Sequence, residues 1–294
     1  MPRAVLIGEA MLELSRADAG WKLGYGGDTL NTAIHLARGG IDTAYLTALG
    51  SDPFSAQMRS AWQAEGLDCT AVLTHPSRQA GLYAITTDAE GERTFTYWRS
   101  DSAARALFDC PGIESALAAA EGADMVAYSL ITLAILPAAA RDAVFALCER
   151  VRARGGTVAF DGNYRPQLWS GSHEARGARD AAIACADIGL PTLEDESALS
   201  GESDAQAVAA HWRALGCGEV IVKLGAQGCL APGGQIVPPP QVLKPIDTSG
   251  AGDAFNGGYL TARLRGSAVA EAILAGHRQA GWVVSRRGAI PPLD

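Results

Sequence analysis

Short apolar runs alternate with stretches of helical periodicity along most of the chain. Buried strands are predicted from the apolar runs at residues 4–7, 43–49, 125–128, 157–160, 188–190 and 220–222. Helices are predicted where apolar residues recur at helical spacing, over residues 54–65, 113–121, 137–154, 173–185, 204–215 and 269–285. Strands and helices that alternate in this way form a mostly parallel sheet with helices on both faces, so the sequence predicts an α/β fold.

One region departs from this alternation and predicts a β-hairpin. Residues 82–87 and 93–99 are rich in β-prone side chains and flank a glycine-containing turn at residues 88–91. With a period of two, Tyr97 and Arg99 share one face of the hairpin. Such a ribbon is suited to close over a polar ligand as a lid, whereas the simpler interpretation is an ordinary hairpin with a solvated arginine.

The domain organisation follows from the same pattern. We expect one domain that spans residues 1–294, with lid strands from about residues 9–25 and 80–100. Within the first of these segments, residues 9–15 alternate weakly between apolar and polar side chains and predict an edge strand. No long linker, low-complexity segment or internal repeat interrupts the sequence.

Composition and charge narrow the class of protein. Of the 294 residues, 48% are apolar and 19% are charged, which is ordinary for a globular chain. The net charge of −8 argues against nucleic acid or an anionic membrane as a partner, because both require a basic surface. No apolar run approaches the roughly 20 residues that span a bilayer, and the N-terminus reads as a first strand rather than a signal peptide. Six scattered cysteines without a CxxC pair are typical of reduced thiols, so we expect a cytoplasmic protein.

Residues 247–255 read Asp-Thr-Ser-Gly-Ala-Gly-Asp-Ala-Phe and form the most informative stretch of the sequence. Apolar and small residues follow at helical spacing, so a loop is expected to become a helix at about Gly250. Gly250 and Gly252 let the backbone approach a ligand, and the N–H groups of the first helical turn attract an anion. Asp253 is then expected beside that anion, where a carboxylate can take a proton from an attacking hydroxyl. A glycine-rich helix start without a ligand is the simpler alternative.

A second glycine-rich run, at residues 24–33, also leads into a helix. Asn31 falls in the first turns of this helix, near Gly27, and a polar side chain beside bare backbone is suited to bind a sugar hydroxyl. A glycine turn followed by an exposed asparagine is the alternative. Further polar clusters follow predicted strands at residues 161–165 and 223–228. Since ligands bind α/β sheets beyond the carboxyl ends of the strands, these clusters are expected to converge with the run at residues 247–255.

Both glycine-rich runs resemble motifs of the ribokinase-like (PfkB) family of sugar kinases, and the resemblance extends from Gly8 to Ala289. It implies a ribokinase-like α/β fold with a small β-sheet lid, ATP-dependent phosphorylation of a sugar hydroxyl, and Mg²⁺. By similarity, Asp253 is the catalytic base. The backbone of Gly250, Ala251 and Gly252 then forms, with that of Asp253, an anion hole for the transferring phosphoryl group.

The resemblance also implies which residues bind the nucleotide and the metal. The residues at the family's nucleotide-binding positions are Thr192, Lys223, Gly225, Ala226, Gly228, Gly250 and Gly252. The family's Asn-x-x-Glu motif is replaced here by Thr-Leu-Glu-Asp, which implies that Asp195 organises the metal through water. This departure leaves open which of Glu194, Asp195 and Glu196 has that role, and a charged helix N-terminus without a metal is the alternative. The adenine contact is not placed by the sequence.

Substrate choice rests on two arginines. The fork of an arginine binds a carboxylate bidentately, so Arg99 and Arg165 favour an acid sugar over a neutral one. Three runs of this sequence, around Asn31, Arg99 and Arg165, look like those of 2-keto-3-deoxygluconate kinases within the family. The sugar-acid site implied by that similarity consists of Gly27, Asp28, Asn31, Tyr83, Tyr97, Arg99 and Arg165. The implied reaction converts 2-keto-3-deoxygluconate to its 6-phosphate with ATP, a step of Entner–Doudoroff-type sugar-acid catabolism.

Other functions stay open at this level. A neutral-sugar kinase, such as a fructokinase or ribokinase, would share the catalytic run but not the need for two arginines. A sugar-acid sensor on the same fold would bind ligand without turning over ATP. A dinucleotide-dependent oxidoreductase is disfavoured because no glycine-rich strand–helix turn lies near Gly8. The sequence leaves open homo-oligomerisation, a monovalent cation near Asp247 and Gly288, and the choice between gluconate and galactonate epimers.

Overall fold

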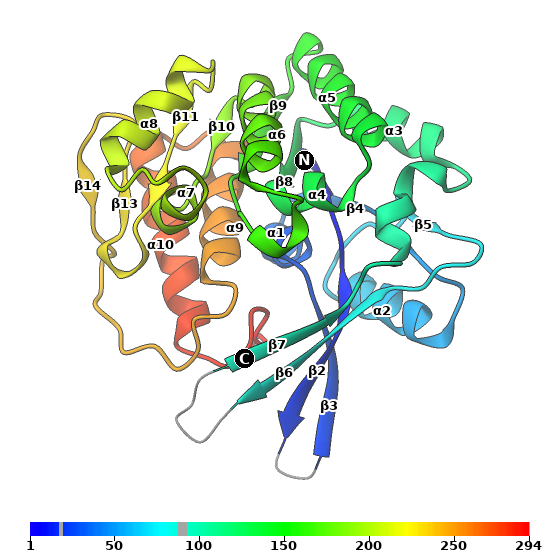
Figure 1. The fold of residues 1–294 in the computed structure, drawn as a ribbon. Coiled ribbons are helices and arrows are strands. Elements are labelled where there is room, and N and C mark those ends of the chain that lie inside the picture. The colour runs from blue at the N-terminus through cyan, green and yellow to red at the C-terminus, as the bar shows by residue number, and fades with distance from the viewer. Residues whose placement is uncertain (18–19, 88–92, 294) are drawn as a thin grey trace.

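The apolar runs form a seven-stranded sheet in which every neighbouring pair of strands is parallel. The computed structural model describes residues 1–17, 20–87 and 93–293 (Figure 1). In spatial order the strands are β11 (Glu219–Val220), β10 (Ile188–Gly189), β9 (Thr157–Asp161), β8 (Met125–Ser129), β1 (Arg3–Ile7), β4 (Asp42–Leu49) and β5 (Val72–Thr74). This arrangement confirms the predicted α/β class with a parallel central sheet.

Helices cover both faces of the sheet because successive residues of each strand point to opposite sides. In β1, Val5 and Ile7 pack into one apolar core, and Ala4 and Leu6 pack into the other. The first core is covered by α3 (Ile113–Glu121), α4 (Leu130–Ile135), α5 (Ala138–Ala153), α6 (Ser172–Cys185) and α8 (Ala205–Ala214). The second is covered by α1 (Asp28–Arg38), α2 (Pro53–Ala64), α9 (Ala251–Leu264) and α10 (Val269–Val284).

A separate four-stranded sheet extends away from these layers (Figure 1). Its spatial order is β3 (Gly20–Gly26), β2 (Met11–Ala17), β6 (Gly81–Thr87) and β7 (Arg93–Trp98). The predicted hairpin is the antiparallel pair of β6 and β7, and its predicted turn at residues 88–91 lies outside the described residues. We refer to this four-stranded sheet as the lid sheet.

Two local predictions of strands were wrong. Residues 9–15 do not form an edge strand, because β2 pairs with β3 on one side and with β6 on the other. The run at residues 220–222 is not one strand, because β11 ends at Val220 and the chain then leaves the central sheet. It continues into a small antiparallel sheet of β12 (Val222–Lys223), β13 (Cys229–Leu230) and β14 (Ile236–Val237). A weak apolar alternation does not distinguish an edge strand from a central strand of a thin, solvated sheet.

The remaining elements are short. They are α7 (Leu193–Ser200) and the 3₁₀ turns η1 (Ala103–Asp109), η2 (Pro166–Leu168) and η3 (Gly225–Gln227). All six cysteines are free thiols, and four of them are buried. Among the described residues, no helix is both long enough and apolar enough to cross a membrane.

Candidate active site

The glycine-rich run at residues 247–255 begins helix α9, as the sequence predicts. Gly250 is the N-cap residue, and its φ of 67° lies in the left-handed region that favours glycine. A Cβ added to Gly250 would lie 2.4 Å from the Cβ of Ala289, so no larger residue fits there. The first helical bond runs from the N–H of Ala254 to the carbonyl of Gly250, at 2.8 Å. The N–H groups that precede Ala254 belong to the first turn, which is where helices bind anions.

Asp253 lies in that first turn and is held by the opposite helix α1. The Nδ2 of Asn31 donates a hydrogen bond of 2.8 Å to Oδ2 of Asp253. Burial raises the pKa of Asp253 to about 7, and the nearby Asp28 and Asp161 carboxylates raise it as well, whereas Asn31 and Lys223 lower it. A carboxylate whose pKa lies near neutral pH is matched to the work of a general base.

Lys223 lies against the backbone of the same turn. Its Nζ is 3.7 Å from the position that a Cβ on Gly252 would occupy. The ammonium donates hydrogen bonds of 3.1 Å to Oδ1 of Asp161 and to Oδ1 of Asn256. Asn256 in turn donates from Nδ2 to Oδ2 of Asp161 at 2.7 Å. The polar clusters expected to converge therefore do so at the carboxyl ends of β9 and β12. Sequence reasoning missed Asn256, although it stands one helical turn after Asp253.

The N-terminus of α1 reaches the same place. A Cβ on Gly27 would lie 2.3 Å from the backbone oxygen of Glu9, so the close approach of the two chain segments requires glycine. Asp28 accepts a hydrogen bond of 3.0 Å from Nδ2 of Asn163, which follows β9. Burial is also the main cause that raises the pKa of Asp28. A small cavity at this end of the sheet is lined by residues that include Asp28, Ser129, Asp161 and Asn256.

On the lid sheet, three aromatic rings form a ladder on one face. The rings of Tyr83 and Tyr97 lie 6.0 Å apart, and the ring of Phe95 stacks on that of Tyr97 at 6.3 Å. The hydroxyl of Tyr83 donates to the carboxylate of Glu13. The guanidinium carbon of Arg99 lies 5.8 Å from the centre of the Tyr97 ring. The predicted common face of this hairpin is thus present.

Arg99 is fixed at the base of the lid sheet. Its side chain is only 10% exposed and forms an ion pair with the buried carboxylate of Glu9, which also accepts from the hydroxyl of Ser102. The Nε of Arg99 is a buried donor that has no acceptor within the described part of the chain. Glu9 was not singled out by sequence reasoning.

Arg165 is held by a different carboxylate. Its Nη1 lies 3.1 Å from Oδ1 of Asp195 and donates to the carbonyl of Tyr164 at 2.7 Å. The side chain is 48% exposed, in contrast to that of Arg99. Burial raises the pKa of Asp195 to about 6, and Arg165 opposes this shift. The structure therefore joins a predicted substrate residue to the predicted metal residue, and it gives the two arginines separate partners.

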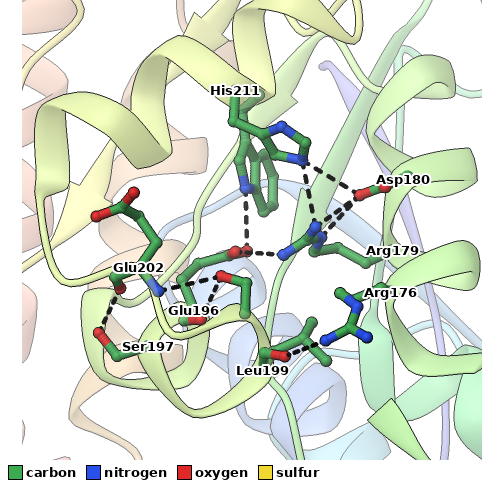
Figure 2. A network of polar contacts seen from close by, with 10 residues as sticks. Arg176, Arg179, Asp180, Glu196, Ser197, Leu199, Glu202 and His211 are labelled. Atoms are coloured by element: carbon green, nitrogen blue, oxygen red, sulfur yellow. Dashed lines mark hydrogen bonds and ion pairs between the residues drawn. The ribbon is translucent and has the colours of Figure 1, made fainter. Parts of the chain in front are cut away.

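The acidic run at the start of α7 divides into residues with different surroundings. Glu196 is buried and accepts hydrogen bonds from Nη1 of Arg179 at 2.6 Å and from Nε1 of Trp212 at 3.0 Å. Figure 2 shows this network, in which His211 and Asp180 also contact Arg179. Glu196 thus ties α7 to α6 and α8. Glu194 is exposed, so Asp195 is the carboxylate of the run that pairs with a site residue.

The other predicted nucleotide-binding residues follow β12 or lie beside it. Thr192 forms a parallel bridge with Lys223. Gly225 and Ala226 lie on the exposed turn η3, and Gly228 is buried after it. These three residues are neighbours of Lys223 in the chain, but they are not part of its hydrogen-bond network.

Asp247 connects the glycine-rich run at residues 247–255 to the C-terminal segment. Its Oδ1 accepts from the N–H of Ser249 and its Oδ2 from the N–H of Gly288, both at 2.9 Å. The sequence leaves open whether a monovalent cation binds near Asp247 and Gly288, and the structure brings these two positions together.

The whole chain, residues 1–294, matches the pfkB family of carbohydrate kinases. It belongs to this family, as the two glycine-rich motifs indicated. A 2-dehydro-3-deoxygluconokinase of Dickeya dadantii (strain 3937) is 41% identical to it over 299 residues, which cover 98% of this chain and 96% of that protein. A fructokinase of Klebsiella pneumoniae is 30% identical over 261 residues, which cover 87% of this chain and 82% of that protein.

Solved structures agree with the fold. Aminoimidazole riboside kinase from Salmonella enterica, complexed with aminoimidazole riboside and an ATP analog, has a TM-score of 0.82 to this chain at 27% identity. The match covers 98% of this chain and 95% of that chain. The ribokinase-like fold class that the sequence predicted is thereby confirmed.

Proposed function

We propose that this chain transfers the terminal phosphoryl group of ATP to the 6-hydroxyl of 2-keto-3-deoxygluconate. The placement of Asp253 supports phosphoryl transfer as the reaction type, because its carboxylate lies in the first turn of a helix and close to the Lys223 ammonium. The observation that favours this substrate is the 41% identity, over nearly the whole chain, to a 2-dehydro-3-deoxygluconokinase. The identity to a fructokinase is lower, at 30%.

Asp253 acts as the general base in this proposal. The 6-hydroxyl gives its proton to the carboxylate, and its oxygen forms a bond to the γ-phosphorus of ATP. The bond between that phosphorus and the ADP oxygen breaks, so the products are the sugar-acid 6-phosphate and ADP. Asn31 orients the carboxylate through its hydrogen bond to Oδ2 of Asp253. Phosphoryl transfer depends mostly on positioning and charge stabilisation, so this small set of groups is sufficient.

The anion hole stabilises the transferring group. The backbone N–H groups at the start of α9, at Gly250, Ala251, Gly252 and Asp253, would bind the phosphoryl oxygens, over which negative charge spreads. The N–H of Ala251 also lies 3.3 Å from the carbonyl oxygen of Thr248. The Lys223 ammonium adds a full positive charge against the same turn. The chain after Lys223, with Gly225, Ala226 and Gly228, and the bridged Thr192 form the nucleotide side of the site.

The residues present fit a Mg²⁺ ion that is carried by the nucleotide. No group of three or more His, Cys, Asp or Glu side chains in the described ranges is arranged to hold a metal by itself. Kinases usually bind Mg²⁺ through substrate phosphates, waters and one or two carboxylates, and the partly buried Asp195 is suited to contact its water shell. When bound, Mg²⁺ supplies neutralisation of phosphate charge. A monovalent cation near Asp247 belongs to the same proposal, and its test is the dependence of kcat on K⁺.

Arg99 and Arg165 recognise the carboxylate of the sugar acid. Arg99 has a buried Nε without an acceptor in the described residues, so an anionic ligand would satisfy a donor that is costly to leave unpaired. Arg165 is half exposed and can turn between Asp195 and a ligand. The sugar hydroxyls would contact Gly27, Asp28 and the Oδ1 of Asn31, and the rings of Tyr83 and Tyr97 would cover the sugar.

An ADP-release assay with Mg-ATP tests this function. The acceptors are 2-keto-3-deoxygluconate, gluconate, fructose and ribose, and a reaction without sugar measures ATP hydrolysis. Selective turnover of the keto-deoxy acid is expected. Preference for fructose or ribose would overturn the sugar-acid proposal while leaving the kinase class intact.

We expect the reaction to take place in the cytoplasm, because free thiols are typical of that compartment and ATP is present there.

A further inference from the structure

Asp161, Lys223 and Asn256 form a closed ring of three hydrogen bonds beneath the anion hole. Lys223 bonds to one oxygen of Asp161 and to Oδ1 of Asn256, and Asn256 bonds to the other oxygen of Asp161, over distances of 2.7–3.1 Å. Lys223 is only 7% exposed and Asn256 only 3%. Buried charges and amides are costly unless they are paired, so this ring has one well-defined arrangement.

The three side chains come from three different elements. Asp161 ends β9, Lys223 ends β12, and Asn256 lies on α9 one turn after Asp253. A lysine ammonium sits on a flexible stem, so its location is set by the acceptors around it. Two fixed acceptors hold this ammonium 3.7 Å from the Cβ position of Gly252. Asn256 provides the acceptor that belongs to the same helix as the anion hole.

We infer that Asn256 is a positioning residue, which together with Asp161 holds the Lys223 ammonium beneath the phosphoryl group and beside the catalytic carboxylate. The inference rests on the phosphoryl transfer proposed above, but not on which sugar accepts the group. Asn256 does not touch the reacting atoms. It acts through Lys223, because its hydrogen bond holds the Lys223 ammonium against α9, the helix whose first turn binds the anion.

The charge of Lys223 also acts on Asp253. The groups that face Asp253 are Asp28 and Asn31 from α1, Asp161 from β9, Lys223 from β12 and Tyr83 from β6. Asp195, from α7, faces Lys223 as well. Lys223 lowers the pKa of Asp253, whereas Asp28 and Asp161 raise it. If the ammonium moves away, the pKa of Asp253 rises. At a given pH, a smaller fraction of the carboxylate is then ionised and available as the base.

The test compares Asn256→Leu, Lys223→Met and the double variant. Leucine has the same branched skeleton of four side-chain heavy atoms as asparagine, although its methyl groups are larger, and the adjoining cavity is already lined by Leu190 and Leu260. We expect Asn256→Leu to lower kcat by about tenfold, less than the loss of a direct oxyanion donor, and to leave the KM for ATP nearly unchanged. The acid limb of the kcat–pH profile should move to higher pH. In the Lys223→Met background, Asn256→Leu should cause no further movement of this limb.

Two results would overturn the inference. One is a fall in kcat for Asn256→Leu with the acid limb unmoved, because a purely structural role predicts that outcome. The other is the same movement of the limb whether or not Lys223 is present. If Asn256→Leu fails to fold, Asn256→Ala takes its place in the series.

A second readout needs no turnover. The sequence contains only three lysines, Lys22, Lys223 and Lys244, so ¹⁵N-lysine labelling introduces only three side-chain nitrogen signals. Lys22 and Lys244 are exposed, and Lys244→Met serves as the control and the assignment variant. The Lys223 signal, identified by its loss in Lys223→Met, should change in Asn256→Leu while the other two stay in place. An unchanged Lys223 signal would overturn the inference. If the wild type prefers another sugar, the proposed substrate fails, and the pH series is run with that sugar.

Discussion

The Nδ2 of Asn31 donates a hydrogen bond of 2.8 Å to Oδ2 of Asp253, although the two residues are 222 positions apart in the sequence. The contact joins the first turn of α1 to the first turn of α9. Each turn follows a glycine that accepts no side chain, Gly27 in one case and Gly250 in the other. The two glycine-rich motifs therefore meet at one place in the fold, where the hydrogen bond from Asn31 holds the Asp253 carboxylate.

Replacement of Asp253 by asparagine should remove the base with little change in shape. We expect kcat to fall by about 10²–10⁴-fold, because a positioned general base contributes on that scale. Nucleotide affinity should change little, since the backbone N–H groups remain. Steady-state kinetics and ADP binding by calorimetry measure the two quantities. Turnover close to that of the wild type would exclude Asp253 as the base.

The pKa of Asp253 predicts how activity depends on pH. The carboxylate must be ionised to accept a proton, and burial raises its pKa to about 7. Activity should therefore fall as the pH decreases through about 7, tenfold for each pH unit well below it. The measurement is kcat/KM from pH 5 to 9 with saturating Mg-ATP. A profile that stays flat down to pH 5 would contradict the raised pKa.

Replacement of Asn31 by leucine should shift the same profile. Asn31 favours the ionised form of Asp253 through its hydrogen bond, so its loss raises the pKa of the carboxylate. The acid limb of kcat/KM should move to higher pH, and the KM for the sugar should rise because Asn31 is also a proposed sugar contact. If only the KM changes and the limb does not move, Asn31 binds the sugar without orienting the base.

Replacement of Arg165 by alanine should weaken binding of the sugar acid. A charge-assisted hydrogen bond contributes about 1.5–3 kcal/mol, which corresponds to a rise in KM of roughly 10–150-fold. Arg150→Ala is a matched control, because Arg150 lies on α5, is similarly exposed and pairs with Glu121. The KM for ATP should change little in both variants. An unchanged KM for the sugar acid in Arg165→Ala would remove Arg165 from the site.

Glu196 should matter for stability rather than for chemistry. Its replacement by alanine leaves Arg179, whose side chain is 4% exposed, without its buried partner. Such a loss typically costs about 3–5 kcal/mol. Asp180→Ala removes a half-exposed partner of the same arginine and should cost about 1 kcal/mol or less. Denaturant unfolding of both variants measures the difference. Equal effects would contradict the central role of Glu196 in the network of Figure 2.

The fold was predictable because its signals are local. Strand and helix periods are read within a few residues, and the order of strands and helices fixes the layers. The errors fell where local signals are weak. Residues 9–15 alternate like an edge strand, yet β2 has a partner on both sides. The apolar run at residues 220–222 contributes residues to two different sheets, the central sheet through β11 and the small antiparallel sheet through β12.

The convergence of residues in the candidate site was predictable only where a sequence motif contains them. Gly250, Asp253 and Asn31 stand in glycine-rich runs, and the structure brings these runs together. Asn256 and Glu9 have no such signal, because their roles depend on partners 95 and 90 positions away. The acidic run of α7 shows the same limit. Its carboxylates look equivalent in the sequence, but packing buries Glu196 and turns Asp195 toward Arg165.

The chemical identity of the product shows whether this protein phosphorylates the 6-hydroxyl of 2-keto-3-deoxygluconate. The wild type is incubated with Mg-ATP and 2-keto-3-deoxygluconate, and the mixture is followed by proton-coupled ³¹P NMR. We expect one phosphomonoester signal per ADP formed, split by the two protons of a terminal CH₂ group. Formation of ADP without that signal, or phosphorylation of fructose or ribose in preference to the keto-deoxy acid, would contradict it.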